Sequence, residues 1–278
     1  MILTDDKLKF LEGKAKEIRR SIILMLVEAR SGHAAGALGM ADIFTALYFG
    51  LLNQDVKKPD WSDRDRVILS NGHICPVLYA TLAEAGYFDK KELSTLRKYG
   101  SRLQGHPHRE FLPLMETSSG PLGEGLAQAV GMALADRLDN SKTSQKFFYC
   151  LMSDGELQEG STWEAVMLAG KEKPHNLIAI IDRNNIQIDG QTEDVMPIEP
   201  LADKWRAFGW QVIEIDGHSF PEIFDAVGMA KSVFNRPSVI IAHTTPGKGV
   251  PEFENKFEWH GKPPTKEEGA QALEEIKN

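Results

Sequence analysis

Two short apolar runs that end in polar residues restrict the fold of this chain more than any other feature. Residues 147–153 read Phe-Phe-Tyr-Cys-Leu-Met-Ser, and residues 177–182 read Leu-Ile-Ala-Ile-Ile-Asp. Unbroken runs of this length are typical of strands that are buried on both faces of a parallel sheet. Parallel neighbours need long crossover connections, so helices are expected between such strands.

Strand and helix patterns do alternate along the rest of the sequence. Apolar and β-branched runs predict further strands at 66–70, 211–215 and 238–243. Helical periodicity predicts helices at 5–30, 41–52, 75–85, 124–138, 161–169, 203–208 and 220–233. The alternation predicts a single doubly wound α/β domain over residues 1–278, with a mainly parallel sheet flanked by helices. Residues 265–278 are expected to form a short C-terminal tail, in which 266–277 is either a short helix or frayed.

Composition and charge limit the classes of function. The 278 residues are 42% hydrophobic, enough for a substantial core, and their formal net charge is −8. An acidic chain of this kind argues against sequence-independent binding of nucleic acid, which needs clustered Lys and Arg. A phosphate-bearing ligand remains compatible, because one divalent cation can reverse the local charge.

The cysteines and the distribution of apolar residues bear on the cellular setting. Cys75 and Cys150 lie far apart without a CxxC partner, so neither a zinc site nor a disulfide framework is indicated. Cys150 lies inside an apolar run and is expected to be a buried, inert thiol. No apolar stretch approaches the roughly 20 residues that span a bilayer, and the charged segment 7–20 does not resemble a signal peptide. We expect a cytoplasmic protein.

The most informative motif is Asp154-Gly155-Glu156, which directly follows the strand predicted at 147–153. Asn184 follows the next predicted strand, one strand–helix–strand crossover later. The carboxyl ends of parallel strands meet at one sheet edge, so Asp154 and Asn184 should meet there. Gly155 leaves its backbone N–H accessible, and the amino end of a following helix favours an anion. One carboxylate, one amide oxygen and one backbone carbonyl suit magnesium, with diphosphate oxygens and water completing the shell.

Each half of this motif has a simpler interpretation when taken alone. Asp-Gly is usually only a turn, and Asn184-Asn185 is another. Together the two halves follow strongly apolar strands at the interval of one crossover. The pair is therefore more specific than either half.

The pair resembles the fingerprint of thiamine-diphosphate enzymes. DGELQEGSTWEAVMLAG at 154–170, followed by LIAIIDRNNIQIDG at 177–190, is similar to transketolases in particular. Further similar segments follow the family's order: SGHAAGALGMADI at 31–43, SNGHICPVLYATL at 70–82, GHP at 105–107, TSSGPLGEGLAQAVGMALA at 117–135 and TTPGKGVPEFENKFEWHGKPP at 244–264. The resemblance covers nearly the whole chain and identifies it as similar to the N-terminal, diphosphate-binding part of transketolases.

The resemblance implies a metal site and a cofactor site. The magnesium ligands that it implies are Asp154, Asn184 and the backbone carbonyl of Ile186. The residues that it implies at thiamine diphosphate are His73, Gly120, Leu122, Asp154, Gly155, Glu156, Asn184 and His260. Among them, Gly155 resembles the residue whose N–H meets the diphosphate. Gly120 and Leu122 resemble loop positions that pack on the cofactor.

The resemblance also implies catalytic residues, namely His33, His73, His106, His260 and Glu159. His33 and His106 resemble sugar-binding histidines, and His73 and His260 resemble histidines near the diphosphate and the reacting centre. Three of them, His33, His73 and His106, lie beside glycines in predicted loops, where an imidazole can reach sugar hydroxyls and shuttle protons. Of the eight histidines, the other four have weaker context: we assign His108 and His175 to the surface, treat His218 as a turn residue, and leave His243 open.

Two acidic residues after the Asp-Gly turn have competing interpretations. Glu159 and Glu164 resemble residues that link the paired active sites of transketolases. Without the resemblance, they would be read as a solvated helix start that the helix dipole favours.

The resemblance further implies a partner. Full-length transketolases continue into pyrimidine and C-terminal domains, which carry the glutamate that activates the cofactor, whereas this chain ends soon after His260. Residues 268–278 read as a soluble tail rather than a severed strand, so we expect a natural subunit rather than a fragment. A second chain is expected to supply the pyrimidine domain, in an assembly with two of each chain.

The implied reaction is transfer of a two-carbon ketol unit from a ketose or its phosphate to an aldose or its phosphate. Two alternatives remain open at this stage. One is another thiamine-diphosphate enzyme subunit, similar to deoxyxylulose-phosphate synthase or to the α-subunit of a 2-oxo acid dehydrogenase; the continuation Ile188-Asp189-Gly190 and the block Trp259-His260-Gly261 favour transketolase. The other is a non-catalytic cofactor-binding subunit. A P-loop nucleotide enzyme is not indicated, because GxxxxGK[ST] is absent.

Overall fold

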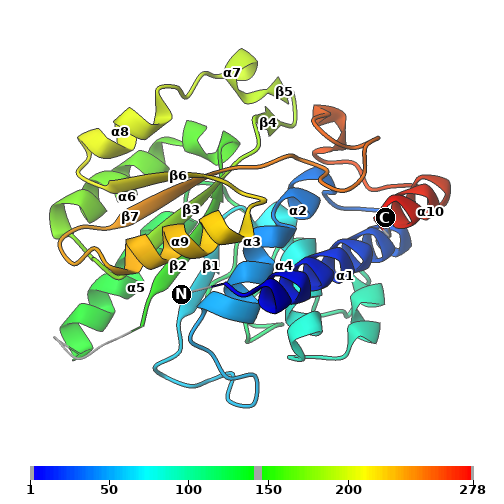
Figure 1. The fold of residues 1–278 in the computed structure, drawn as a ribbon, viewed down its shortest axis with the longest axis horizontal. Coiled ribbons are helices and arrows are strands. Elements are labelled where there is room, and N and C mark those ends of the chain that lie inside the picture. The colour runs from blue at the N-terminus through cyan, green and yellow to red at the C-terminus, as the bar shows by residue number, and fades with distance from the viewer. Residues whose placement is uncertain (1–2, 141–145, 277–278) are drawn as a thin grey trace.

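Five short apolar segments form a parallel sheet in the computed structural model, which describes residues 3–140 and 146–276 (Figure 1). Across the sheet the strands are β1 (Arg66–Leu69), β2 (Phe148–Ser153), β3 (Leu177–Arg183), β7 (Ser238–His243) and β6 (Gln211–Asp216). Every neighbouring pair is parallel. Both β2 and β3 are buried along their full length, as their unbroken apolar sequence predicts.

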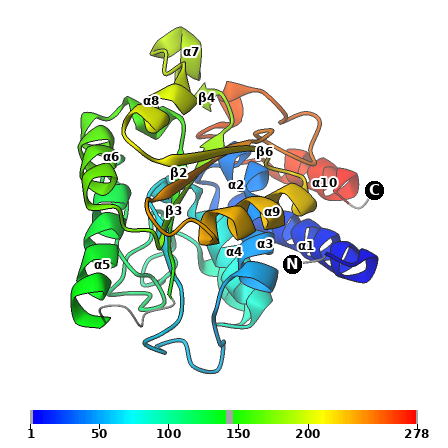
Figure 2. The same cartoon turned by 60° about the vertical axis from the view of Figure 1, so that its left-hand side comes forward.

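Helices cover both faces of this sheet, as Figures 1 and 2 show from two directions. One face carries α5 (Gly125–Asn140), α6 (Gly160–Glu172) and α8 (Leu201–Ala207). The other carries α1 (Asp5–Ala29), α3 (Ala41–Ala46), α4 (Cys75–Ala85) and α9 (Phe220–Lys231). Alternate residues of β2 divide between the two cores, Tyr149 and Leu151 into one, Cys150 and Met152 into the other. The predicted doubly wound α/β fold is confirmed.

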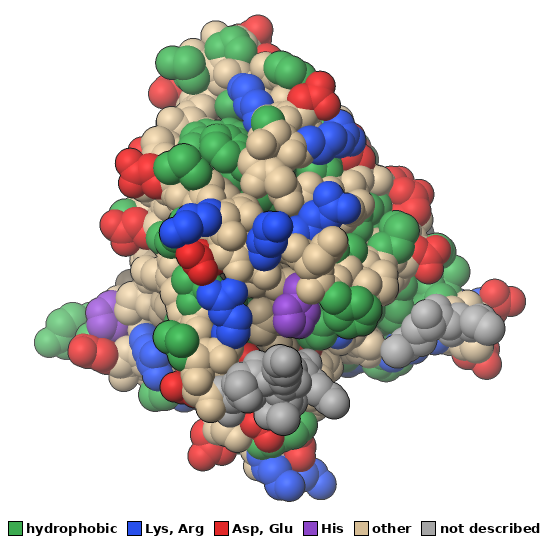
Figure 3. Space-filling model, turned by 90° about the vertical axis from the view of Figure 1, so that its left-hand side faces the viewer, with side chains coloured by type: hydrophobic (Ala, Val, Ile, Leu, Met, Phe, Trp, Pro, Cys, Tyr) green, Lys and Arg blue, Asp and Glu red, His purple; other side chains and the backbone are tan. Residues whose placement is uncertain are grey.

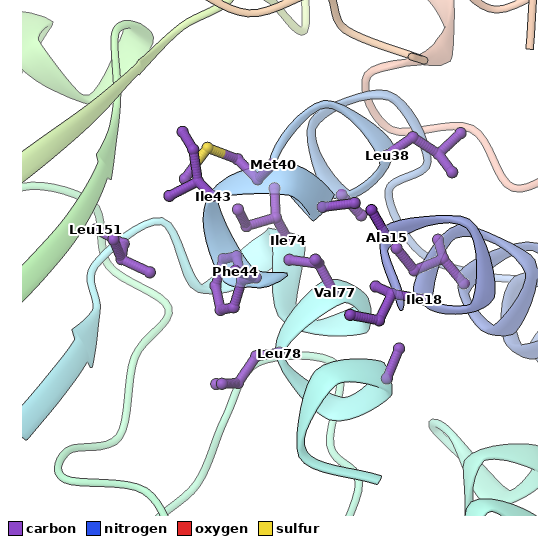
Figure 4. Packing of buried hydrophobic residues seen from close by; sticks show 14 of the residues in the cluster. Ala15, Ile18, Leu38, Met40, Ile43, Phe44, Ile74, Val77, Leu78 and Leu151 are labelled. Carbon is purple, nitrogen blue, oxygen red and sulfur yellow. The ribbon is translucent and has the colours of Figure 1, made fainter. Parts of the chain in front are cut away.

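The larger core lies between α1, α3 and α4 (Figure 4). Ile18 of α1, Phe44 of α3 and Val77 of α4 are fully buried there. These side chains lie where α1, α3 and α4 pack against one another, as expected for helices that each bury an apolar stripe. Both cysteines are buried and free, as expected for Cys150.

The helix predicted at 41–52 is confirmed over 41–51, as α3 followed directly by a π-helical turn at Leu47–Leu51. The short helix before it, α2 (Ala35–Gly39), was not predicted. A glycine lies at the end of α2 and another in the π-helical turn, and other parts of the chain approach both closely. A Cβ on Gly39 would lie 3.0 Å from the carbonyl oxygen of Thr245, and one on Gly50 would lie 2.4 Å from the ring of Phe224. The packing partners, rather than local periodicity, divide this segment.

A small projection beyond β3 was not predicted from the sequence. It contains β4 (Ile186–Gln187), β5 (Gly190–Gln191) and α7 (Thr192–Val195), and it stands above the sheet in Figures 1 and 2. β4 and β5 pair antiparallel. Elements of two to four residues are too short to produce a periodic pattern. We refer to residues 186–200 as the lobe.

The C-terminal segment forms a docked helix, α10 (Lys266–Glu275). Thr265 and Glu268 form a capping box at its start. Ala272 is fully buried, and the guanidinium of Arg20 in α1 donates to the carbonyl of Leu273 at 3.1 Å. Of the two forms considered for this tail, the structure shows the helix, which packs on α1; residues 277 and 278 lie outside the described residues.

Two surface properties complete the description. Among the described residues, no helix combines the length and the apolar character that crossing a membrane requires. Figure 3 shows a face on which several Lys and Arg side chains lie across the middle, whereas most acidic side chains lie toward its margins. The formal net charge of the whole chain is −8.

Candidate active site

The polar side chains that follow β1, β2 and β3 gather at one edge of the sheet, as the sequence predicts. Asp154 follows β2 and is fully buried. Its Oδ1 accepts from the N–H of Gly155 at 2.7 Å, and its Oδ2 accepts from the N–H of Asn185 at 2.7 Å and from Arg183 at 2.9 Å. Burial raises the pKa of Asp154, and the adjacent Arg183 guanidinium partly offsets the rise. The Asp-Gly and Asn-Asn turns therefore meet.

Asn184 is oriented by a residue that the sequence analysis did not single out. The amide Nδ2 of Asn184 donates to Asp182 at 2.7 Å, and its Oδ1 accepts from the N–H of Ile186 at 3.1 Å. Asp182 also accepts a short hydrogen bond from Thr244. Burial raises the pKa of Asp182 to about 7. An acid at the end of an otherwise apolar strand was the signal that could have identified it.

This oxygen set matches a hard cation in its chemistry. Asp154 Oδ1 and Asn184 Oδ1 each accept one protein hydrogen bond, which leaves lone pairs for a ligand. The described residues contain no group of three or more His, Cys, Asp or Glu side chains placed to hold a metal. One carboxylate beside one amide oxygen matches the few protein ligands that Mg²⁺ has when phosphates and water complete its shell.

Gly155 and Glu156 make contacts within the protein that differ from the cofactor contacts predicted for them. The N–H of Gly155, assigned to the diphosphate, donates to the side chain of Asp154. Glu156 is fully buried, and its carboxylate accepts from Ser70, from the N–H of Gly123 at 2.8 Å and from the N–H of Ser153 at 3.3 Å. The contacts of Glu156 place it behind the site, where it joins the end of β1, the end of β2 and the loop before α5.

Unpartnered polar atoms collect around the turn that follows β1. Both amide atoms of Asn71, the Oγ of Ser119 and the Nδ1 of His33 are buried without a hydrogen-bond partner among the described residues. Gly72 lies against Ser119 so closely that a Cβ on it would be 2.1 Å from the Ser119 hydroxyl. Buried polar groups in native proteins nearly always have partners. A cluster of unpaired ones indicates a place where a polar ligand supplies them.

Three of the predicted catalytic histidines form one cluster. The ring centroids of His33 and His73 are 5.0 Å apart, those of His33 and His260 5.5 Å, and those of His73 and His260 5.2 Å. Burial lowers the pKa of His33 and of His260 to about 4, and it lowers the pKa of His73 well below its ordinary value. All three rings are therefore neutral near pH 7. A neutral imidazole offers one donor and one acceptor, which suits hydroxyl groups.

His106, the fourth predicted histidine, is exposed beside this cluster. The Cβ position of Gly120 lies 3.8 Å from the ring of His106, so the loop of Gly120 and Leu122 passes next to it. Desolvation and the nearby charge of Arg97 lower the pKa of His106. His106 and Gly120 therefore lie at the rim of the cluster.

Arg97 is a second residue that the sequence analysis missed. Its guanidinium donates to the hydroxyl of Ser31 at 3.0 Å and to the carbonyl of Gly105 at 3.3 Å. These two contacts join the loop of His33 to the loop of His106. Arg97 lies in the mixed polar stretch 90–119, where no periodic pattern marked it.

The other predicted acids and histidines do not join the histidine cluster, although Glu159 lies beside Gly123. Glu159 and Glu164 are exposed at the start of α6, where no side-chain hydrogen bond or ion pair is seen within the described residues. His175 and His243 are exposed. The surface assignment of His108 needs correction, because its ring is half-buried and packs on Phe111 at 4.7 Å.

His218, expected to be a turn residue, joins distant segments. Its Nε2 accepts from the N–H of Thr245 at 2.7 Å, so Nδ1 carries the proton and donates to Asp42 at 2.7 Å. Asp42 in turn forms a buried ion pair with Arg19 of α1 at 2.6 Å. This network fixes the start of the segment 244–261, which carries His260.

A hollow of about 700 Å³ lies apart from this cluster, beside the first residues of β1 and β2. Charged residues line it, including Arg64, Glu116, Asp136 and Lys146, which form ion pairs with one another. It contains none of the predicted site residues. Several of its lining charges are paired within the protein, and we attach no function to it.

A parallel sheet that brings Asp-Gly, Asn and a cluster of neutral histidines to one edge defines a thiamine-diphosphate-binding domain. The family model described as "Transketolase, thiamine diphosphate binding domain" matches residues 12–276. The chain therefore belongs to the transketolase family and corresponds to its N-terminal, diphosphate-binding part, as the resemblance predicted.

The chain is similar both to relatives of about its own length and to relatives more than twice as long. The chain is 41% identical over 266 residues to the 6-deoxy-6-sulfo-D-fructose transketolase subunit of Clostridium sp. (strain MSTE9), covering 96% of each. It is 39% identical to an apulose-4-phosphate transketolase subunit of Phocaeicola vulgatus, covering 96% of this chain and 93% of that one. It is 40% identical to human transketolase but spans only 42% of that protein. The solved transketolase of Leishmania mexicana superposes with a TM-score of 0.91 at 34% identity over 96% of this chain and 41% of that one.

Proposed function

We propose that this chain is the N-terminal subunit of a split transketolase, which transfers a two-carbon ketol unit from a ketose or its phosphate to an aldose or its phosphate. The observation that carries this proposal is the cluster of His33, His73 and His260 beside the Asp154–Asn184 edge. Relatives of matching length are themselves named transketolase subunits. Membership in the transketolase family favours this reaction over those of the other thiamine enzymes considered above.

The residues present fit thiamine diphosphate and Mg²⁺. Asp154, Asn184 and the carbonyl of Ile186 would hold the cation, and unpaired Asn71 and Ser119 lie at the same end of the sheet. Asp182 would keep the oxygen of Asn184 directed to the cation, because it binds the amide nitrogen. When bound, thiamine diphosphate supplies the carbanion-stabilising chemistry that ketol transfer requires.

The histidine cluster would act on the sugar. Neutral His33, His73 and His260 each present one N–H donor and one lone pair, so together they can orient neighbouring hydroxyl groups. The rings are partly buried, which limits contact with water, and a neutral ring can take up or release a proton at its free nitrogen. His106 at the rim would contact the more exposed end of the sugar.

We further propose that a second chain completes the enzyme. We assign the role of the activating glutamate to none of the described residues. The chain spans 42% of the length of human transketolase. The partner would carry the pyrimidine domain, and the assembly would contain two of each chain. Effective catalysis needs both ends of the cofactor held in a fixed geometry, which this chain does at one end only.

The test is ketol transfer by the purified chain, with and without a candidate pyrimidine-domain chain, at saturating Mg²⁺ and thiamine diphosphate. We expect turnover only in the mixture, and its loss in Asp154→Ala. Full turnover by the chain alone would contradict the split-enzyme proposal. Normal cofactor affinity in Asp154→Ala would contradict the metal site, and turnover of pyruvate in place of a ketose would indicate a different thiamine enzyme.

A further inference from the structure

Arg183, the last residue of β3, joins three carboxylates from separate parts of the chain. It is 3% exposed. Its Nη1 lies 2.9 Å from Asp154, and its Nη2 lies 2.8 Å from Glu193 and 2.9 Å from Glu199. Asp154 belongs to the proposed cation site, whereas both glutamates belong to the lobe. One guanidinium therefore connects the site to the lobe directly.

The two glutamates also hold the backbone of the lobe. Glu193 accepts from the N–H of Ile198 at 3.2 Å and from that of Glu199 at 3.5 Å. Glu199 accepts from the N–H of Leu201 at 2.6 Å. The carboxylates that Arg183 binds are thus the same groups that fold residues 193–201. Loss of the guanidinium would leave two like charges close together and release this segment.

On the side of the guanidinium that faces the proposed cation site, Arg183 holds the side chain of Asp154 in one orientation. It occupies Oδ2 together with the N–H of Asn185, so Oδ1 is the oxygen with a lone pair for a cation. Arg183 carries one positive charge, whereas Asp154, Glu193 and Glu199 carry three negative charges. The net negative charge that remains favours binding of a divalent metal ion. Both functions of Arg183, toward the lobe and toward Asp154, depend on the same planar group, which a lysine cannot replace with equal geometry.

We propose that Arg183 is a positioning residue that couples the order of the lobe to the carboxylate of Asp154. The coupling is reciprocal: a change at Asp154 loosens the lobe, and a change at Glu193 and Glu199 weakens ligand binding at Asp154. The first direction depends only on the described contacts, whereas the second rests on the proposed cation site.

Hydrogen exchange of the ligand-free chain tests the first direction. Peptides that cover 186–201 should exchange about tenfold faster or more in Arg183→Gln and in Asp154→Asn, because charge-assisted hydrogen bonds are lost. Arg206→Gln is the matched control, since this exposed arginine on nearby α8 pairs with Asp203 at 2.8 Å. Unchanged exchange of the lobe in Asp154→Asn would overturn the coupling, whatever the chain binds.

Calorimetric titration with Mg²⁺ and thiamine diphosphate tests the second direction. Arg183→Gln should lose about 10- to 100-fold in affinity, as expected for a residue that orients a metal ligand, and Arg183→Lys should recover only part. The double variant Glu193→Gln and Glu199→Gln should lose about fivefold or more. Wild-type affinity in that double variant would overturn the coupling. Absence of binding by wild type with its partner chain present would instead contradict the proposed cofactor site, and the exchange data would then decide the coupling alone.

Discussion

Acid should destabilise this chain through its partly buried histidines, and His33 gives the clearest case. Its pKa is lowered to about 4 in the folded chain, mainly by burial and also by nearby His260, whereas an unfolded histidine titrates near 6.5. Between these two values the unfolded state binds more protons than the folded state. Stability is therefore complete above about pH 6.5 and falls as the pH is lowered toward 4.

The size of the effect follows from this difference. At pH 5 the unfolded imidazole is mostly protonated and the folded one is mostly neutral, which amounts to about 2 kcal/mol of lost stability for His33. Protonated His33 would lie 5.0 Å from His73 and 5.5 Å from His260, measured between ring centroids, so the three rings cannot charge together without repulsion.

Urea unfolding of the cofactor-free chain at pH 7.5 and pH 5 measures this loss. His33→Gln should reduce the difference between the two pH values by about 2 kcal/mol. Ser31→Ala is the matched control, since it changes the same loop without removing a titratable group, and its pH difference should equal that of the wild type. An equal pH difference in His33→Gln and wild type would refute the argument that His33 is neutral because it is buried.

Three further predictions concern residues behind the site. His218→Ala leaves the N–H of Thr245 unpaired and removes a partner of Asp42, so urea unfolding should show a loss of about 2–4 kcal/mol; a loss under about 0.5 kcal/mol would contradict the network. Glu156→Ala removes the acceptor of three donors, so it should cost about 3–5 kcal/mol of stability and weaken thiamine diphosphate binding. Glu156→Gln should lie between Glu156→Ala and wild type in both properties. Unchanged cofactor affinity of the stable Gln variant in calorimetry would argue against a supporting role of Glu156. Arg97→Gln releases the loops of His33 and His106, so kcat/KM for the sugar should fall about tenfold or more while cofactor affinity stays within about twofold; loss of cofactor affinity would place Arg97 on the wrong side of the site.

The sequence by itself determined the strands of the sheet and the edge at which Asp154 and Asn184 meet. An unbroken apolar run such as 177–182 is buried on both faces when it forms a central strand of a parallel sheet. The residues that follow the run must then lie at the edge formed by the carboxyl ends of the strands. For that reason Asp154 and Asn184 could be placed together from the order of residues alone. The same local signals located α4 and β7 with their observed bounds.

Tertiary structure alone decided which side chains surround that edge. His33, His73 and His260 come from three segments that no local pattern relates, and they meet because the packing of α2, of the β1 turn and of 244–261 brings them together. Glu156 turns inward, and Arg183 reaches both Asp154 and the lobe, because each finds its hydrogen-bond partners in distant parts of the chain. Periodicity is a property of neighbouring residues, whereas burial and hydrogen bonding of a polar side chain depend on everything that packs around it.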